Sequence, residues 1–175
     1  MYCGMTGSDD LLWGNSHQRH RVDDVHIHTY SASVRNTTSL DLCNCFATRQ
    51  AARHVTRIYE RHLAGAEVTS AQYGILVLLD ERRGMTMNEL AAALVMDRTT
   101  LLRALKPLQR DGLVNSKRSE SDPRQLILAL SADGHRKLKQ ATRLWRKAQT
   151  EFETQVGTAR AARMRSDLLA LARPA

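Results

Sequence analysis

Apolar residues recur every three or four positions along most of the chain beyond residue 38, and this spacing predicts a mainly helical protein. Polar clusters, Gly and Pro divide the pattern into separate segments. The longest segment, 132–156, follows the N-cap residue Ser131 and ends at Gly157. We expect helices at 40–63, 70–83, 87–94, 98–110, 132–156 and 158–172.

Two short predicted helices stand close together near the middle of the chain. Thr86 and Glu89 form a capping box at the start of 87–94, and Asp97 is a good N-cap for 98–110. Only a three-residue turn without Gly separates the two helices. The pattern therefore predicts a helix-turn-helix.

The segment that follows these helices has the pattern of a hairpin. A strand begins at Val114, a polar and turn-rich stretch covers 115–124, and 126–130 is an apolar run of strand length. A strand, a charged loop and a second strand directly after a helix-turn-helix form a wing, here 114–130. The predicted fold class is mostly α with a small β-wing, an α+β winged helix-turn-helix flanked by further helices.

The formal net charge of +8 is spread unevenly along the chain. Residues 98–124 hold seven Lys and Arg against three Asp and Glu, and residues 135–175 hold ten against three. A dense basic block is the electrostatic footprint of a face that binds a polyanion, although a solvated charged surface gives the same pattern. The charge alone therefore does not decide between the two.

The predicted helix 98–110 has one apolar face, formed by Leu101, Leu105 and Leu108, which leaves its basic side outward. Arginine can bind guanine through two hydrogen bonds, and hydroxyl groups and helix N-termini can bind phosphate. Basic residues of a wing can reach the DNA backbone or a minor groove. The candidate DNA-binding residues are Arg98, Thr99, Thr100, Arg103 and Lys106 in the helix, and Lys117, Arg118 and Arg124 in the wing.

Residues 42–139 resemble the MarR family of bacterial regulators, with the strongest matches at Met96–Leu101, Leu105–Leu108, Arg110–Val114 and Asp122–Arg124. The resemblance implies a homodimer that binds a palindromic operator in double-stranded DNA, acts as a repressor and is released by a small ligand or an oxidant. It also implies that Arg124 contacts the minor groove and that Asp122 holds the wing. Leu102 stands where such relatives often have a polar residue, so their operator sequence does not transfer.

The chain divides into three regions on this reading. We expect a flexible N-terminal arm at 1–38, a helical dimerisation region at 39–65 and 132–175, and a winged helix-turn-helix DNA-binding domain at 66–131. The apolar stripes of the outer helices exceed what a winged helix needs for its own core. A two-fold dimer would bury them and would match a two-fold operator.

Two cysteines give the only hint of a trigger. Cys43 and Cys45 lie beside Arg49 near the start of a predicted helix and are candidate redox sites, although buried and inert thiols are the favoured alternative. Residues two apart on a helix point about 200° from each other, so we do not expect these two to pair, and an intersubunit bond stays open. A small aromatic ligand is expected from the resemblance alone.

Other classes of protein fit the sequence less well. There is no Gly-rich phosphate loop, nucleophile elbow or metal-spaced carboxylate pair, so we expect neither an enzyme nor a cofactor. The histidines at 17, 20, 26 and 28 could bind a metal, but no further ligand completes a shell, and we expect a polar tail. A sequence-neutral architectural DNA-binding protein and a protein-interaction module remain alternatives.

The sequence also bears on the compartment. No apolar run is long enough to span a membrane, and the N-terminus lacks the pattern of a secretory signal. Three cysteines cannot form a paired framework and suit a reducing compartment. We therefore expect a cytoplasmic protein.

Overall fold

The structure, a computed structural model of the chain, describes residues 38–119, 122 and 124–172. These residues belong to one structural unit, 38–175. Residues 1–37 lie outside the described part, so the predicted arm and its four histidines do as well. In chain order the elements are the 3-10 helix η1 (Ser39–Leu42), α1 (Asn44–Leu63), the 3-10 helix η2 (Ala64–Ala66), α2 (Ser70–Glu81), β1 (Met85–Thr86), α3 (Met87–Leu94), α4 (Arg98–Arg110), β2 (Val114–Arg118), β3 (Leu126–Leu130), α5 (Ala132–Val156) and α6 (Thr158–Ala172).

The mainly helical class with a small β-wing is confirmed, and each predicted helix is present. The first helix begins later than predicted. Thr38 and Asp41 form a capping box around η1, and the chain is extended at Cys43 before α1 starts. The Sγ atom of Cys43 accepts a hydrogen bond from the Phe46 N–H at 3.5 Å and so caps α1. Asp41 therefore belongs to the cap of η1 and not to the first turn of α1.

The sheet has three antiparallel strands in the order β1-β3-β2. The two wing strands pair in register from Val114 opposite Leu130 to Arg118 opposite Leu126. Strand β1 pairs with the far side of β3 and was not predicted, because two residues are too few to show strand alternation. The sheet thus ties the wing to the start of α3.

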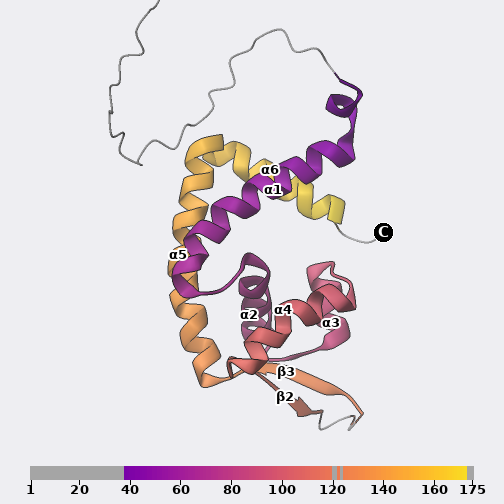
Figure 1. The fold of residues 1–175 in the computed structure, drawn as a ribbon, viewed down its shortest axis with the longest axis vertical. Helices are drawn as coiled ribbons and strands as arrows, with labels where there is room; N and C mark the ends of the chain where they lie inside the picture. The colour runs from indigo at the N-terminus through magenta and orange to yellow at the C-terminus, as the bar shows by residue number, and fades with distance from the viewer. Residues whose placement is uncertain (1–37, 120–121, 123, 173–175) are drawn as a thin grey trace, which may run out of the picture. The chain divides into compact units, whose positions relative to one another are not determined.

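The core lies where α2, α3 and α4 pack together above the sheet (Figure 1). Leu76 of α2, Leu90 of α3, and Leu101 and Leu105 of α4 are fully buried in it. Because both leucines of α4 face inward, the opposite side of this helix is held toward solvent. The predicted outward face of α4 is thereby fixed by the core.

The wing is joined to α5 by a close backbone contact. The Ser131 hydroxyl donates to the Gly112 carbonyl oxygen at 2.7 Å and accepts a hydrogen bond from the Gly134 N–H at 2.9 Å. A Cβ atom on Gly134 would lie 2.1 Å from the carbonyl oxygen of Leu113. Only glycine permits this approach between the first turn of α5 and the chain entering β2.

Helix α1 packs across α5 in the other half of the unit (Figure 1). Glu151 of α5 contacts Arg61 Nη2 at 2.5 Å and His62 Nε2 at 2.7 Å, both on α1. The hydrogen bonds from His62 and then from Arg61 lower the pKa of Glu151. This cluster holds the C-terminal half of α1 against α5.

Candidate DNA-binding interface

The start of α4 is fixed by Asp97. Its carboxylate accepts hydrogen bonds from the Thr100 N–H at 2.9 Å and from the Thr100 hydroxyl at 2.6 Å. These two bonds lower the pKa of Asp97, because they favour the charged carboxylate. The predicted DNA contact Thr100 thus has its hydroxyl proton engaged in the cap, which leaves the oxygen only as an acceptor.

The turn before α4 adopts an unusual backbone conformation. Val95 ends α3 with φ 51° and ψ 43°, in the left-handed region that favours glycine. The Met96 N–H and the Val95 N–H close the end of α3 by hydrogen bonds to carbonyl oxygens of Ala91 and Ala92. The tight turn of the helix-turn-helix therefore places the β-branched residue Val95 in a strained conformation. Glycine would adopt the same conformation without strain.

The outward side of α4 carries the predicted cationic residues. Arg98, Thr99, Arg103 and Lys106 are exposed. Among the residues that the structure describes, the three basic side chains in this group have no hydrogen-bond or ion-pair partner. Leu102 is half-buried beside these exposed residues.

The helix ends with a basic residue that is already paired. Arg110 donates from Nε to Asp111 Oδ1 at 2.8 Å. This hydrogen bond and the charge of Asp111 raise the pKa of Arg110, and the same bond lowers the pKa of Asp111. The net charge offered to a ligand at this end of α4 is therefore small.

The wing presents its predicted basic residues to solvent. Lys117, Arg118 and Arg124 are exposed. Asp122 accepts hydrogen bonds from the Arg124 N–H and from Gln125 Nε2, both at 3.0 Å. In this geometry the Asp122 carboxylate shapes the turn that leads into β3, as a residue that supports the wing should.

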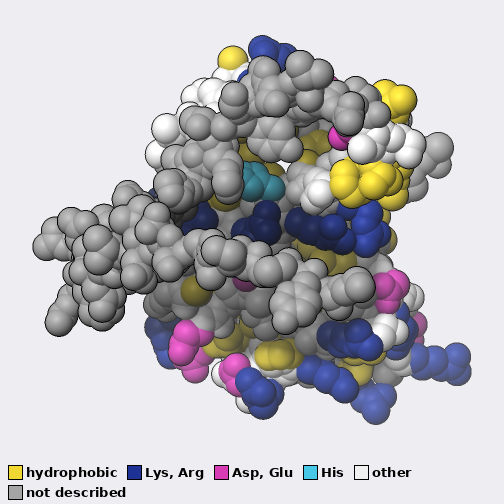
Figure 2. Space-filling model, turned by 45° about the horizontal axis from the view of Figure 1, so that its top comes forward, with side chains coloured by type: hydrophobic (Ala, Val, Ile, Leu, Met, Phe, Trp, Pro, Cys, Tyr) yellow, Lys and Arg dark blue, Asp and Glu magenta, His cyan; other side chains and the backbone are white. Residues whose placement is uncertain are grey.

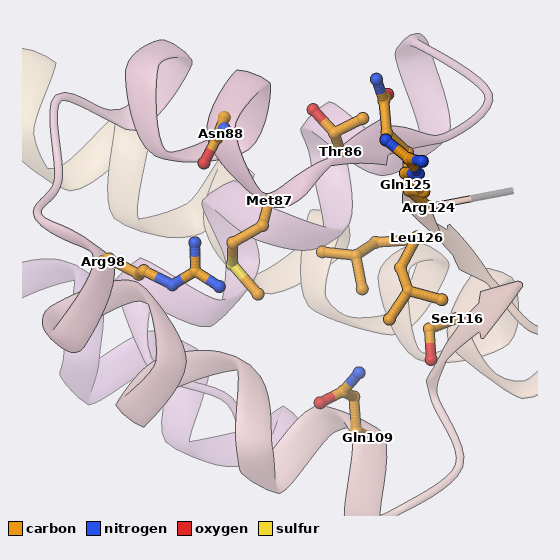
Figure 3. A pocket seen from close by; sticks show the side chains of 10 residues that line it. Thr86, Met87, Asn88, Arg98, Gln109, Ser116, Arg124, Gln125 and Leu126 are labelled. Carbon is orange, nitrogen blue, oxygen red and sulfur yellow. The ribbon is translucent and has the colours of Figure 1, made fainter. Parts of the chain in front are cut away.

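A pocket of about 450 Å³ separates α4 from the wing (Figure 3). Arg98 and Gln109 reach into it from α4, and Arg124 and Gln125 lie on the opposite rim. The other lining residues are Thr86, Met87, Asn88, Ser116, Leu126 and Leu128. The sequence reading missed the neutral polar members of this set, although Gln109 follows Arg98 by eleven positions, a spacing that places both on one side of the helix.

Cationic side chains dominate this face because the neighbouring carboxylates are committed elsewhere. Glu89 accepts hydrogen bonds from the N–H and hydroxyl of Thr86, which lower the pKa of Glu89. Asp97 caps α4, and Asp122 holds the turn of the wing. Figure 2 shows Lys and Arg side chains along the lower part of the view and in a second band across its middle, with few Asp and Glu between them. Arg98, Arg103 and Lys106 can therefore contact an anion without first breaking a hydrogen bond or ion pair to another described residue.

The candidate redox cysteines are placed differently from the prediction. Cys43 is partly exposed and Cys45 is exposed, so neither is the buried thiol that was favoured. Cys43 also lies outside the helix, at the extended N-cap, whereas Cys45 lies in the first turn of α1. The argument that both project from one helix in opposite directions is therefore wrong.

His, Cys, Asp and Glu side chains occur along most of the described elements. Among the described residues, no group of three or more His, Cys, Asp or Glu could hold a metal ion. None of the described helices is both long and apolar enough to cross a membrane.

The chain is similar to known transcription regulators. A profile of the MarR family matches residues 68–126, from just before α2 to the start of β3. The organic hydroperoxide resistance transcriptional regulator of Bacillus subtilis is 34% identical over 90 residues, which are 51% of this chain and 61% of that protein. The match thus spans about three fifths of this curated relative.

Solved structures extend the similarity to the outer helices. The transcriptional regulator MosR of M. tuberculosis, in complex with DNA, is 37% identical with a TM-score of 0.66, over 74% of this chain and 93% of MosR. The repressor CouR of Rhodococcus jostii, bound to a 23-mer DNA duplex, is 27% identical with a TM-score of 0.72, over 81% of this chain and 100% of CouR. The matched lengths exceed the winged helix alone.

Proposed function

The chain belongs to the MarR family, and from that premise we propose that it is a transcription regulator that binds double-stranded DNA. Helix α4 enters a major groove and the wing reaches the adjacent minor groove. The observation that carries the proposal is the cationic face of α4 and the wing. The side chains of its basic residues Arg98, Arg103, Lys106 and Arg124 have no hydrogen-bond or ion-pair partner among the described residues, while the nearby carboxylates are bonded within the fold.

The proposed regulator acts as a homodimer on a palindromic operator. In a single chain, α6 leaves Leu168 and Leu171 exposed by 53% and 78%, and η1 leaves Leu40 and Leu42 exposed by 51% and 80%. Large apolar side chains exposed to this extent favour burial against a partner. A second copy is the natural occupant, because a two-fold dimer presents two α4 helices to a two-fold site.

Bound across a promoter, such a dimer excludes polymerase and represses the gene, and this is the direction of regulation that we propose. CouR is itself described as a transcriptional repressor, and its similarity to this chain supports that direction. The MarR family is one of transcription regulators and not of enzymes. Access to chromosomal DNA places the proposed activity in the cytoplasm.

A binding titration tests the proposal. The full chain is titrated with the DNA upstream of its own gene and with a scrambled duplex of equal length, at two salt concentrations. We expect at least about a hundredfold preference for the upstream DNA, since specific regulators exceed their own nonspecific binding by about 10³–10⁷. Equal affinity for both duplexes, with the same salt dependence, would instead support the architectural alternative.

An oxidant is the trigger that we propose for release of the DNA. The Bacillus relative is a regulator of organic hydroperoxide resistance. In this chain Cys45 is exposed and the Sγ atom of Cys43 caps α1. A thiolate attacks the peroxide O–O bond and becomes a sulfenic acid, while the hydroperoxide leaves as the alcohol. Oxidation at Cys43 would alter the cap and with it the start of α1.

The redox trigger is tested by adding an organic hydroperoxide, such as cumene hydroperoxide, to the protein–DNA complex. We expect release from the wild type and retention by the variant that carries both Cys43→Ser and Cys45→Ser, because serine caps a helix but is not oxidised by peroxide. Release of both proteins alike would exclude the two thiols. A small aromatic ligand would then be the remaining candidate trigger.

A further inference from the structure

We infer that the pocket between α4 and the wing seats one backbone phosphate of each operator half-site, and that Asn88, Gln109 and Ser116 are neutral phosphate contacts. The inference rests on the proposed function, because it concerns how the same face holds DNA. These residues set the register between the two elements that read the DNA. They are positioning residues and carry no base readout.

The position of the pocket follows from the geometry of duplex DNA. The major and minor grooves are separated by a sugar-phosphate backbone, so a helix in one groove and a wing in the next must straddle a single strand. The pocket lies between these elements, with Gln109 on α4, Ser116 on β2 and Asn88 on α3 around it (Figure 3). A backbone phosphate is the chemical group that passes through this gap.

The polar groups of the pocket lack acceptors within the fold. The side chains of Asn88, Gln109 and Ser116 have no hydrogen-bond partner among the residues that the structure describes. Two carboxylates that lie close in sequence to lining residues already have partners: Glu89 accepts hydrogen bonds from Thr86, and Asp122 accepts one from the Arg124 N–H. These solvent-accessible groups are therefore free to donate to a ligand, and a phosphodiester offers oxygens that only accept.

The floor of the pocket is apolar. Met87 and Leu128 line it beside Leu126, whose side chain is 55% exposed on the wing. This surface suits the carbon atoms of a deoxyribose that adjoins the phosphate. Cations close the two ends, with Arg98 on α4 and Arg124 on the wing. The lining matches a stretch of sugar-phosphate backbone better than a free inorganic anion, which has no apolar part.

Neutral and charged contacts differ in a measurable way. Each Lys or Arg that neutralises a phosphate contributes about 0.9 to the slope of log affinity against log salt, because it releases counterions. A neutral donor adds affinity without this release. We expect Arg98→Ala and Arg124→Ala to lower both the affinity and the slope, and Asn88→Ala or Gln109→Ala to lower the affinity while the slope stays the same.

Phosphate substitution identifies the contact directly. The duplex is the strongest binder selected from a random-sequence pool, and uncharged methylphosphonates replace its phosphates one at a time. We expect one position per half-site at which the wild type loses affinity by about tenfold or more. The variant with Asn88→Ala and Gln109→Ala binds the unmodified duplex more weakly and is insensitive at that position. Asn115→Ala, next to Ser116 but not in the pocket lining, is the matched control and keeps the wild-type profile.

The outcomes separate this inference from the proposed function. If a preferred duplex is selected but no methylphosphonate effect disappears in the double variant, the seat is wrong while specific DNA binding stands. If no duplex is preferred over the starting pool, the proposed function fails first. Competition by millimolar inorganic phosphate as strong as that by DNA would assign the pocket to a free anion. Thermal unfolding of the double variant at the wild-type midpoint excludes misfolding as the cause of weaker binding.

Discussion

The two halves of this chain treat their apolar side chains in opposite ways. In the winged helix, Leu76, Leu90 and Leu105 are fully buried within one chain. In α6, Leu168 and Leu171 are 53% and 78% exposed, although they continue the helical apolar stripe that begins at the buried Ala161. The winged helix buries its large apolar side chains within the chain, whereas α6 leaves part of its apolar stripe exposed to solvent.

The difference shows which part of the fold depends on a partner. The core that holds α4 and the wing in place is closed within one chain, and it includes Leu63 of α1 and Leu138 and Ala141 of α5. The outer helices gain most of their hydrophobic stabilisation only when a second copy covers them. We propose that a dimer completes the apolar packing of the outer helices, and the predictions below act either on the winged helix or on these helices.

The largest effect is expected from Gly134→Ala in the self-contained half. The new Cβ atom would meet the Leu113 carbonyl oxygen, and backbone cannot move aside as a flexible side chain can. We expect a loss of about 3 kcal/mol in the free energy of unfolding, the upper end for overpacking, measured by urea denaturation. Gly65→Ala is the control, since its Cβ would meet only the Leu144 side chain at 3.3 Å. Equal losses in both variants would show that the join at Gly134 is not special.

The next effect concerns the exposed leucines of α6. Leu168→Glu with Leu171→Glu places two charges in the proposed dimer contact, so we expect the dimer dissociation constant to rise at least about a hundredfold, or about 2.7 kcal/mol. Sedimentation velocity over a range of concentrations measures the change. The winged helix should keep its thermal transition, because neither residue belongs to its core. Ser166→Glu, on the other side of α6, should dimerise normally; a wild type that is monomeric throughout would contradict the account.

A third prediction concerns the outward face of α4. Arg103→Ala removes a side chain from the centre of the outward face of α4, and we expect operator affinity to fall by about 1–3 kcal/mol with relaxed base preference. Affinity for scrambled duplex should fall much less. Arg160→Ala on α6 removes the same charge far from α4 and serves as the control in the same fluorescence titration. An equal loss of affinity for the operator and for the scrambled duplex would show that Arg103 contacts a phosphate and not a base.

The smallest effect concerns the cap of α4. We expect Asp97→Ala to lower the free energy of unfolding, whereas Asp97→Asn keeps a capping oxygen. The fold lowers the pKa of Asp97, so its carboxylate stabilises the protein above the ordinary aspartate pKa of about 3.9. That contribution is lost as the pH falls through the lowered pKa. Thermal melts between pH 7 and 3 should therefore show a shallower acid loss for Asp97→Asn than for the wild type.

Much of the winged helix could be predicted because local chemistry specifies it. Capping residues such as Thr86 and Asp97 mark the helix starts, and the leucine spacing of α4 marks its buried face. Strand β1 could not be predicted, because its pairing with β3 depends on contacts distant in sequence. The pocket escaped for the same reason, since Asn88, Gln109 and Ser116 come together only through the fold.

The dimerisation region was harder to predict in detail. The apolar stripe of α6 was recognised, but a stripe gives no sign of whether its own chain or a partner covers it. The start of α1 was misplaced because a cysteine is an uncommon N-cap, and the extended backbone at Cys43 leaves no local signal in the sequence.

The most direct test of the account compares a complete operator with half of one. The duplex selected from a random pool is titrated intact and with one half-site scrambled, and sedimentation equilibrium gives the number of protomers bound. The account predicts two protomers on the intact duplex and an affinity at least about a hundredfold above that for the half-site duplex. One protomer bound with equal affinity to both duplexes would contradict it, because the outer helices would then have no part in placing two α4 helices on the DNA.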